Sequence, residues 1–184
     1  MRLGIDLDGV VADFNTGWIR LYNEQFDAQL TRSMVKTWNG LLDISHFETM
    51  GEFWQWARQG DGPSMFRHLD TFDGAVESLV ELSRDHDIVI VTTKPDWAIH
   101  DTLAWLSDNQ IPTREIHITA EKWRVSCDVY LDDSPEQVET IHLMRPDRVM
   151  CRFVRPWNTP VEGTLDVGDW PDFLAIVESL ATTT

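Results

Sequence analysis

Short apolar runs recur along most of the chain and give the first indication of its fold. Residues 2–7 form an apolar run that ends in an acid, and residues 88–93 form a continuous β-branched run. Both are typical of strands buried inside a parallel sheet. Three further short runs, at 115–119, 128–132 and 148–154, are bounded by polar or turn residues and also predict strands.

Amphipathic stretches separate these predicted strands. Their apolar residues recur at helical spacing, and two stretches open with capping signals: Asp73 is a candidate N-cap, and Asp169 precedes Trp170 and Pro171 in the order expected for a cap followed by proline. The predicted helices span 73–85, 96–108, 134–145 and 169–181. Strands that alternate with helices of this length predict right-handed βαβ units, and therefore an α/β fold with an open, doubly wound parallel sheet.

Residues 14–72 interrupt this alternation. They contain helical patterns but no convincing strand, and they are rich in aromatic residues. One amphipathic stripe is formed by Trp18, Leu21, Tyr22 and Phe26. We therefore expect a helical cap subdomain at 14–72, inserted into a core domain made of residues 1–13 and 73–184.

Composition narrows the class of protein. The 184 residues are 42% hydrophobic and 25% charged, which is typical of a folded soluble chain rather than a disordered one. No apolar run approaches the roughly 20 residues of a membrane span, and acids stand where a signal peptide needs apolar residues. Cys127 and Cys151 lie in apolar surroundings and are expected to be buried, reduced thiols. We expect a cytoplasmic protein without membrane contact.

Charge restricts the partners. The formal net charge is −16, which argues against a nucleic-acid polymer as partner, because such proteins neutralise phosphates with Lys and Arg. A small phosphorylated substrate is compatible with this charge only where a metal ion or a few cations reverse the local field. The chain has three lysines, Lys36, Lys94 and Lys122, so each of them is a candidate for such a place.

Acidic residues gather where two predicted strands end. Asp6 and Asp8 follow the first strand, with Gly9 permitting a tight turn, and Asp132 and Asp133 end the strand at 128–132. Carboxylates at the carboxyl edge of neighbouring parallel strands converge on the crevice where such sheets bind ligands, and Mg²⁺ would relieve their repulsion. The structural alternative is that DxDG is only a turn and DDSPE only a helix N-cap.

Two further polar residues complete this candidate site. Thr92 ends the strand at 88–93, where its hydroxyl can bind a phosphate oxygen, and Lys122 stands ten residues before Asp132. An ammonium beside a phosphoryl group would neutralise charge on its oxygens during transfer. The alternative for Lys122 is an ordinary salt bridge with Glu121 or Asp128.

The order of these motifs resembles the four-motif pattern of the haloacid dehalogenase (HAD) superfamily: DxDG after the first strand, a Thr after a hydrophobic strand, a Lys, and then DD after another strand. More narrowly, the chain is similar to the 5′(3′)-deoxyribonucleotidases. The quoted segments are DLDGVVADF, MFRHLDTFDGAVESL, VTTKP, ITAEKWRVSCDVYLDD and DWPDFLAIVESL. Residues 27–62 match poorly. The resemblance implies a HAD-like, Rossmannoid core with an inserted helical cap.

For the chemistry, the resemblance implies a phosphomonoesterase that works through an aspartyl-phosphate. Asp6 would be the nucleophile, and Asp8 would be the general acid and then the general base, which requires a raised pKa. Mg²⁺ would be held by a carboxylate oxygen of Asp6, the backbone carbonyl of Asp8 and Asp133, with Asp132 as a neighbour or an alternative ligand. Thr92 and Lys122 would hold the phosphoryl oxygens.

For the substrate, the resemblance implies that Phe14 and Phe66 lie against the nucleobase, and that Thr93 binds the phosphate or the sugar. The family shows a serine and then a proline after the motif threonine, whereas this chain has Thr93, Lys94 and Pro95, so the sugar contacts are open. The remaining aromatic residues of the cap are expected mainly in its core. They include Trp38, Trp54 and Trp56.

These expectations combine into one hypothesis: a Mg²⁺-dependent phosphatase of nucleoside monophosphates, with deoxypyrimidine nucleotides such as dUMP and dTMP as substrates. One alternative is a HAD phosphatase of another small metabolite. A second, of a different class, is a receiver-like phospho-acceptor domain, although its acidic pair would follow the first strand and its acceptor would lie mid-chain. The resemblance also raises a homodimer as an expectation, since family members often dimerise.

Overall fold

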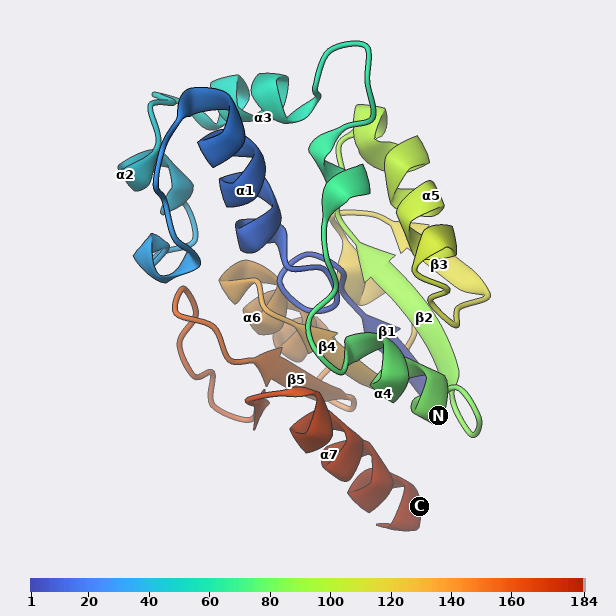
Figure 1. Cartoon of the computed structure of the whole chain (residues 1–184). Coiled ribbons are helices and arrows are strands. Elements are labelled where there is room, and N and C mark those ends of the chain that lie inside the picture. The colour runs from blue at the N-terminus through green and yellow to red at the C-terminus, as the bar shows by residue number, and fades with distance from the viewer. Residues whose placement is uncertain (184) are drawn as a thin grey trace.

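The computed structural model describes residues 1–183. Six strands form one sheet in the order β3-β2-β1-β4-β5-β6, and every neighbouring pair is parallel (Figure 1). The strands are β1 (Arg2–Ile5), β2 (Asp87–Thr92), β3 (Glu115–Ile118), β4 (Val129–Asp132), β5 (Val149–Phe153) and β6 (Leu165–Val167). The order reverses between β1 and β4, so their following loops diverge and leave a crevice at the carboxyl edge.

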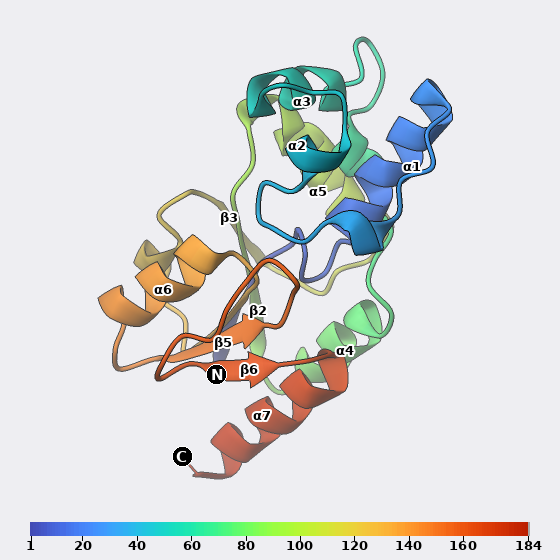
Figure 2. The same cartoon turned by 90° about the vertical axis from the view of Figure 1, so that its left-hand side faces the viewer.

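Helices cover both faces of this sheet, as the doubly wound prediction requires. The helices are α1 (Phe14–Phe26), α2 (Leu41–Ile44), α3 (Met50–Ala57), α4 (Ala75–Leu82), α5 (Ile99–Asp108), α6 (Pro135–Met144) and α7 (Trp170–Thr183). Alternate residues of β2 belong to different cores: Ile88 and Ile90 pack with α4, α5 and α7, whereas Val89 and Val91 pack with α6. Figure 2 shows α6 on one side of the strands and α4 and α7 on the other.

Residues 14–72 lie beyond the carboxyl ends of the strands, with α1, α2 and α3 above the sheet in Figure 1. The two connections to this insertion run side by side, because Asp13 N donates to Asp70 O at 2.8 Å and Phe72 N donates to Val11 O at 2.8 Å. The division of the chain into 1–13 with 73–184 and 14–72 stays a prediction, and Thr184 lies outside the described residues.

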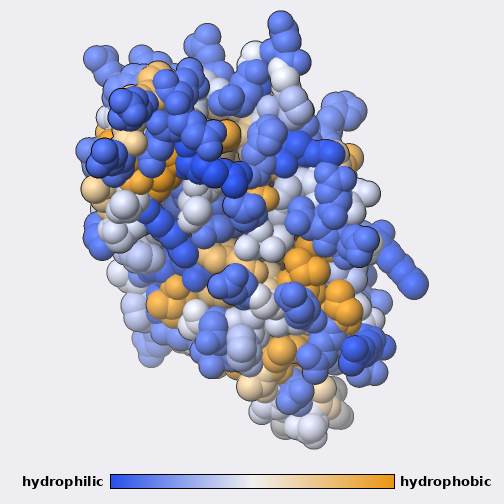
Figure 3. Space-filling model, viewed as in Figure 1, coloured by the Kyte–Doolittle hydropathy of each residue, from blue (hydrophilic) through white to orange (hydrophobic). Residues whose placement is uncertain are grey.

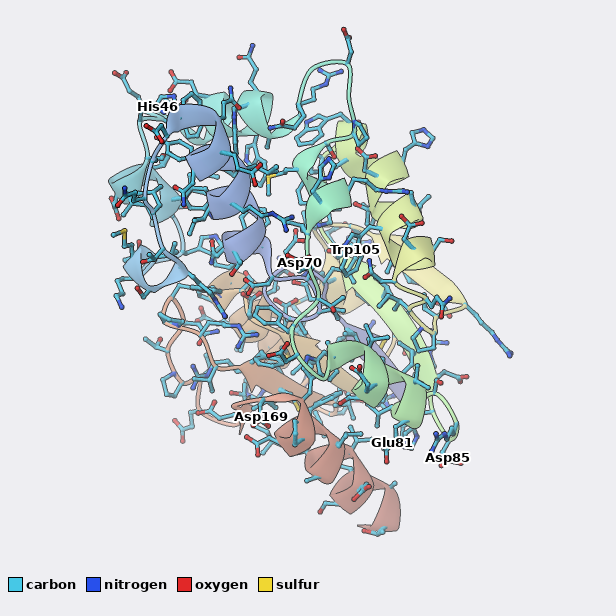
Figure 4. All side chains as sticks on the ribbon, viewed as in Figure 1. His46, Asp70, Glu81, Asp85, Trp105 and Asp169 are labelled. Carbon is cyan, nitrogen blue, oxygen red and sulfur yellow. The ribbon has the colours of Figure 1, made fainter. Side chains whose placement is uncertain are left out.

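The returning end of the insertion is also anchored on α5. The indole N–H of Trp105 donates to Leu69 O at 2.7 Å, and Arg20 on α1 forms an ion pair with Asp70 at 3.0 Å. Figure 4 shows Asp70 and Trp105 close together near the centre of the molecule. The segment that closes the insertion is therefore bound both to its own first helix and to a helix of the sheet layer.

Several local expectations were correct and others were wrong. Asp169 caps α7, since its Oδ1 accepts the N–H of Asp172 at 2.9 Å. Asp73 is not a cap: α4 begins at Ala75 after Gly74, whose φ of 76° suits glycine. Strand β6 was missed because it is three residues long and two of them are exposed.

The hydrophilic surface and the two buried cysteines are as the composition led us to expect. The face seen in Figure 3 is mainly hydrophilic, with small and separated apolar patches. Cys127 and Cys151 are both buried and free, and burial raises their pKa values to about 11 and about 12 respectively. Within residues 1–183, no helix combines the length and the apolar character needed to cross a bilayer.

Candidate active site

The turn that follows β1 is built by one carbonyl and one glycine. The N–H groups of Val10, Val11 and Ala12 all lie within hydrogen-bonding distance of Leu7 O, at 3.2, 2.8 and 2.8 Å. Gly9 has a φ of 79°, and a Cβ on it would lie 2.0 Å from Oδ2 of Asp133. Any larger residue at position 9 would therefore be strained and would also displace that carboxylate.

The strand ends bring three acids into one buried cluster. Asp6 after β1 and Asp132 and Asp133 at the end of β4 each offer an oxygen within 4.8 Å of the others. Their exposed fractions are 6%, 2% and 2%. Burial and the neighbouring carboxylates, acting against the attraction of Lys122, raise the pKa of Asp132 to about 6 and raise the pKa of Asp133 well above its ordinary value. The cluster therefore calls for cations.

Lys122 supplies one of these cations. Its Nζ lies 2.9 Å from Oδ1 of Asp6 and 2.6 Å from Oδ2 of Asp132, and only 4% of the side chain is exposed. Burial alone would lower the pKa of Lys122, but the two carboxylates outweigh burial and raise it. Glu121 and Asp128, the two acids suggested as ordinary salt-bridge partners of Lys122, pair with Arg124 and Arg148 instead.

The remaining oxygens of the cluster show where a metal ion would fit. Both oxygens of Asp132 have partners, since Oδ2 accepts from Lys122 and Oδ1 accepts the N–H of Ser134 at 2.9 Å. Asp133 uses only Oδ2, which accepts the indole N–H of Trp157 at 2.9 Å; its Oδ1 is buried and has no hydrogen-bond partner among the described residues. An unpartnered, buried carboxylate oxygen on a residue of this acidic cluster suits a divalent cation that prefers oxygen ligands, as Mg²⁺ does.

Lys94 is a site residue that sequence reasoning did not assign. Its Nζ lies 2.6 and 2.5 Å from the two carboxylate oxygens of Asp8, and 3.9 Å from the centre of the Phe66 ring. Burial raises the pKa of Asp8 and lowers that of Lys94, while their mutual attraction acts against both shifts. The scarcity of lysine, together with a position two residues after Thr92, was the signal that could have found it.

A cavity of about 400 Å³ lies between this cluster and the insertion. The strand ends contribute polar residues to its wall, including Asp6, Asp8, Thr92, Thr93, Lys122 and Asp133. The insertion contributes mainly apolar and aromatic residues, including Phe14, Leu41, Met50 and Trp54, together with the polar residues Asn15, Thr37 and Asn39. One wall can therefore receive a charged group and the opposite wall a flat apolar one.

Of the residues predicted to contact substrate, Thr92, Thr93 and Phe14 line the cavity and Phe66 does not. Thr92 lines the cavity with a buried hydroxyl that has no hydrogen-bond partner among the described residues. Thr93 and Phe14 line it too, although the hydroxyl of Thr93 donates to Thr119 O at 3.0 Å. Phe66 is 2% exposed and is not part of this cavity wall; it packs behind Phe14, with ring centres 6.1 Å apart. Its contact with substrate stays a prediction.

The expectation that the other cap tryptophans belong to the core was wrong for Trp38, which is 53% exposed and lines the cavity. Trp54 lines the cavity as well and stacks on Phe66, with ring centres 6.1 Å apart. Trp56 is outside the cavity wall and donates its indole N–H to Gln25 at 2.7 Å. Periodicity could not place Trp38, because residues 27–49 contain only short helical turns, and α3, which carries Trp54 and Trp56, is only eight residues long.

Comparison with protein families gives one match over nearly the whole chain. The family model described as "5' nucleotidase, deoxy (Pyrimidine), cytosolic type C protein" matches residues 1–182. The "Putative 5'(3')-deoxyribonucleotidase" of Chlorobaculum tepidum is 25% identical, over 98% of this chain and 91% of its own length. The "5'(3')-deoxyribonucleotidase" of Clostridium acetobutylicum is 26% identical, over 97% of this chain and 95% of its own.

Solved structures agree on the fold. The putative HAD-hydrolase YfnB from Bacillus subtilis, whose structure is bound to magnesium, superposes with a TM-score of 0.68 at 17% identity, over 96% of this chain and 97% of its own. The HAD-like protein SP0104 from Streptococcus pneumoniae gives 0.68 at 12% identity, over the same shares. These likenesses confirm the predicted HAD-like α/β fold, and the family match favours a hydrolase over the receiver-like alternative.

Proposed function

The chain belongs to the deoxypyrimidine-type, cytosolic type C 5′-nucleotidase family and is a phosphoric monoester hydrolase. We propose that its substrates are nucleoside monophosphates, above all deoxypyrimidine nucleotides such as dUMP and dTMP. The proposal includes Mg²⁺ as cofactor and an aspartyl-phosphate on Asp6. The observation that carries it is the cluster of Asp6 and Asp133 oxygens beside Lys122 and Thr92, on one wall of a cavity whose other wall is aromatic.

The proposed Mg²⁺ ligands are carboxylate oxygens of Asp6 and Asp133 and the backbone carbonyl of Asp8. The unpartnered Oδ1 of Asp133 supports this choice. Asp132 has both oxygens engaged, so we assign it to holding Lys122 rather than to the ion. When bound, the ion would offset the negative charge of the phosphate and of the surrounding carboxylates.

Asp6 is the proposed nucleophile because it is buried and fixed. The ion pair of its Oδ1 with Lys122 orients the carboxylate at the cavity wall. An oxygen of Asp6 would form a bond to phosphorus while the bond from phosphorus to the sugar oxygen breaks. Water would then attack the phosphorus of the aspartyl-phosphate, which releases phosphate and restores the Asp6 carboxylate.

Asp8 is the proposed proton carrier of both steps. It would give a proton to the leaving sugar oxygen and then take one from the attacking water. Burial raises its pKa, which is the direction that a proton donor near neutral pH requires. The two contacts from Lys94 hold the Asp8 carboxylate in place at the edge of the cavity.

The phosphate and base contacts follow from the two cavity walls. The ammonium of Lys122 and the unpartnered hydroxyl of Thr92 would bind phosphoryl oxygens. Phe14 would stack on the pyrimidine ring, with Phe66 as a base contact or as the ring that supports Phe14 from behind. Thr93 would contact the phosphate or the sugar. A cytoplasmic location and a homodimer stay predictions.

Steady-state kinetics on dUMP, dTMP, UMP, dAMP and a sugar phosphate, with and without EDTA, test this proposal. We expect the highest kcat/KM for the deoxypyrimidine nucleotides and no turnover in EDTA. Asp6→Asn should fold and be inactive, whereas Asp61→Asn, on an exposed loop outside the cavity wall, should be as active as the wild type. A tenth of wild-type activity in Asp6→Asn would exclude it as nucleophile. Equal activity on all substrates would favour a HAD phosphatase of another metabolite.

A further inference from the structure

The segment Arg155–Asn158, which follows β5, lies against the ends of both strands that carry the acidic cluster. Trp157 donates its indole N–H to Oδ2 of Asp133 at 2.9 Å, and the amide of Asn158 donates to the backbone carbonyl of Asp133 at 2.8 Å. Arg155 donates from Nε to Gly9 O at 2.8 Å. One short segment therefore holds the turn after β1 and the end of β4.

This segment is itself fixed by buried polar contacts. Oδ1 of Asn158 accepts from Nη1 of Arg152 at 2.6 Å and from Arg155 N at 3.1 Å. The guanidinium of Arg152 is 3% exposed and forms two contacts with Asp166 on β6, at 2.8 and 2.6 Å. A continuous set of hydrogen bonds thus runs from the edge strand of the sheet to Asp133, so the position of Asn158 is determined by the sheet itself.

The contact with Trp157 also selects one oxygen of Asp133. Because Oδ2 accepts the indole N–H, Oδ1 is the oxygen that is left without a hydrogen-bond partner among the described residues, and it is buried. The Asp133 carboxylate itself belongs to the cluster with Asp6 and Asp132. Without the indole donor, repulsion from the two neighbouring carboxylates would favour rotation of the Asp133 side chain away from the cluster. Donors that orient a metal-binding side chain raise its affinity for the ion.

From these contacts we infer that Trp157 and Asn158 are positioning residues for Mg²⁺ binding, which fix the Asp133 carboxylate with Oδ1 directed to the ion. The inference rests on the proposed function, because it assumes that Asp133 is a metal ligand. It assigns a role to a loop outside the four motifs of the candidate site.

Trp157→Phe tests the inference because it removes the indole N–H and keeps an aromatic ring. Mg²⁺ binding is measured by calorimetry without substrate, and the melting temperature is measured in EDTA. We expect a Mg²⁺ Kd raised fivefold or more, in keeping with the roughly 10–100-fold effect usual for such partners, and a melting temperature in EDTA close to that of the wild type. Trp170→Phe is the matched control, since the indole nitrogen of Trp170 is buried and has no partner among the described residues. It should leave the Mg²⁺ Kd unchanged.

Kinetics on dUMP at increasing Mg²⁺ concentration give a second measurement. In Trp157→Phe, kcat should be recovered at saturating Mg²⁺, because only the occupancy of the ion is reduced. A Mg²⁺ Kd raised less than fivefold would overturn the inference, and so would an equal loss in Trp170→Phe. A raised KM for dUMP with unchanged Mg²⁺ affinity would make Trp157 a substrate contact instead. If the wild type binds Mg²⁺ as expected but hydrolyses no nucleotide, the proposed function fails and the inference does not.

Discussion

Removal of the buried charge of Lys122 should destabilise the fold as well as stop catalysis. Lys122→Met keeps an unbranched side chain of similar length but leaves Asp6 and Asp132 without their cation, at 2.9 and 2.6 Å in the wild type. Breaking a buried ion pair by deleting one partner costs about 3–5 kcal/mol, because the other charge is left uncompensated. For a chain of this size the expected fall in Tm is about 6–20 °C.

Urea unfolding near pH 8 in EDTA measures this loss without interference from a bound ion. Lys36→Met is the matched control, because Lys36 is exposed, and it should change the free energy of unfolding by less than about 0.5 kcal/mol. The loss in Lys122→Met should become smaller as the pH falls towards about 5, since Asp132, whose pKa is raised to about 6, needs no cation once it is protonated. A loss below about 1 kcal/mol near pH 8 would refute the view that Lys122 balances the acidic cluster.

Two further predictions concern the same cluster. Gly9→Ala should lose at least about 1–2 kcal/mol of stability from its positive φ and should also weaken Mg²⁺ binding, because its Cβ would displace Asp133. Gly60→Ala, with a φ of 61° and open space around it, should show the backbone cost alone; equal metal affinity in the two variants would contradict the packing argument. Burial raises the pKa of Asp132 to about 6, above its unfolded value, so its contribution to stability is present at low pH and is lost as the pH rises through about 6. The urea midpoint in EDTA should therefore fall more steeply between about pH 4 and 7 in the wild type than in Asp132→Asn, and parallel curves would contradict this assignment.

The buried strands were predictable because short, continuous apolar runs rich in β-branched residues strongly favour strands over other secondary structure. The run at 88–93 is continuous and β-branched, and β2 spans Asp87–Thr92. The motifs at strand ends were predictable for a related reason, since parallel strands place their following residues at one edge. Asp6 and Asp133 are far apart in sequence, yet their oxygens lie within 4.8 Å. The DDSPE motif is both a helix N-cap and part of the candidate site, because Ser134 caps α6 while Asp133 lines the cavity.

The residues that were missed act through contacts that no local pattern encodes. Lys94 reaches Asp8 across 86 positions, and Trp157 reaches Asp133 across 24. Neither belongs to a regular element: one follows β2 and the other follows β5. Side chains in such loops are placed by the packing of the whole sheet, so their partners could be read only from the structure.

The placement of lysine explains how a chain with a net charge of −16 can accommodate a phosphate. Two of its three lysines, Lys94 and Lys122, are buried against carboxylates at the carboxyl edge of the sheet. At these positions each lysine offsets a carboxylate, so the cluster presents less negative charge to a dianion than its acids alone would. Lys122 is shared by Asp6 and Asp132, which leaves Asp133 as the acid without a protein cation within ion-pair distance among the described residues. Lys122 balances only one of the two carboxylates that share it, so the unbalanced charge is divided between this pair and Asp133. Asp133 is the member of the cluster that the Arg155–Asn158 segment holds in place.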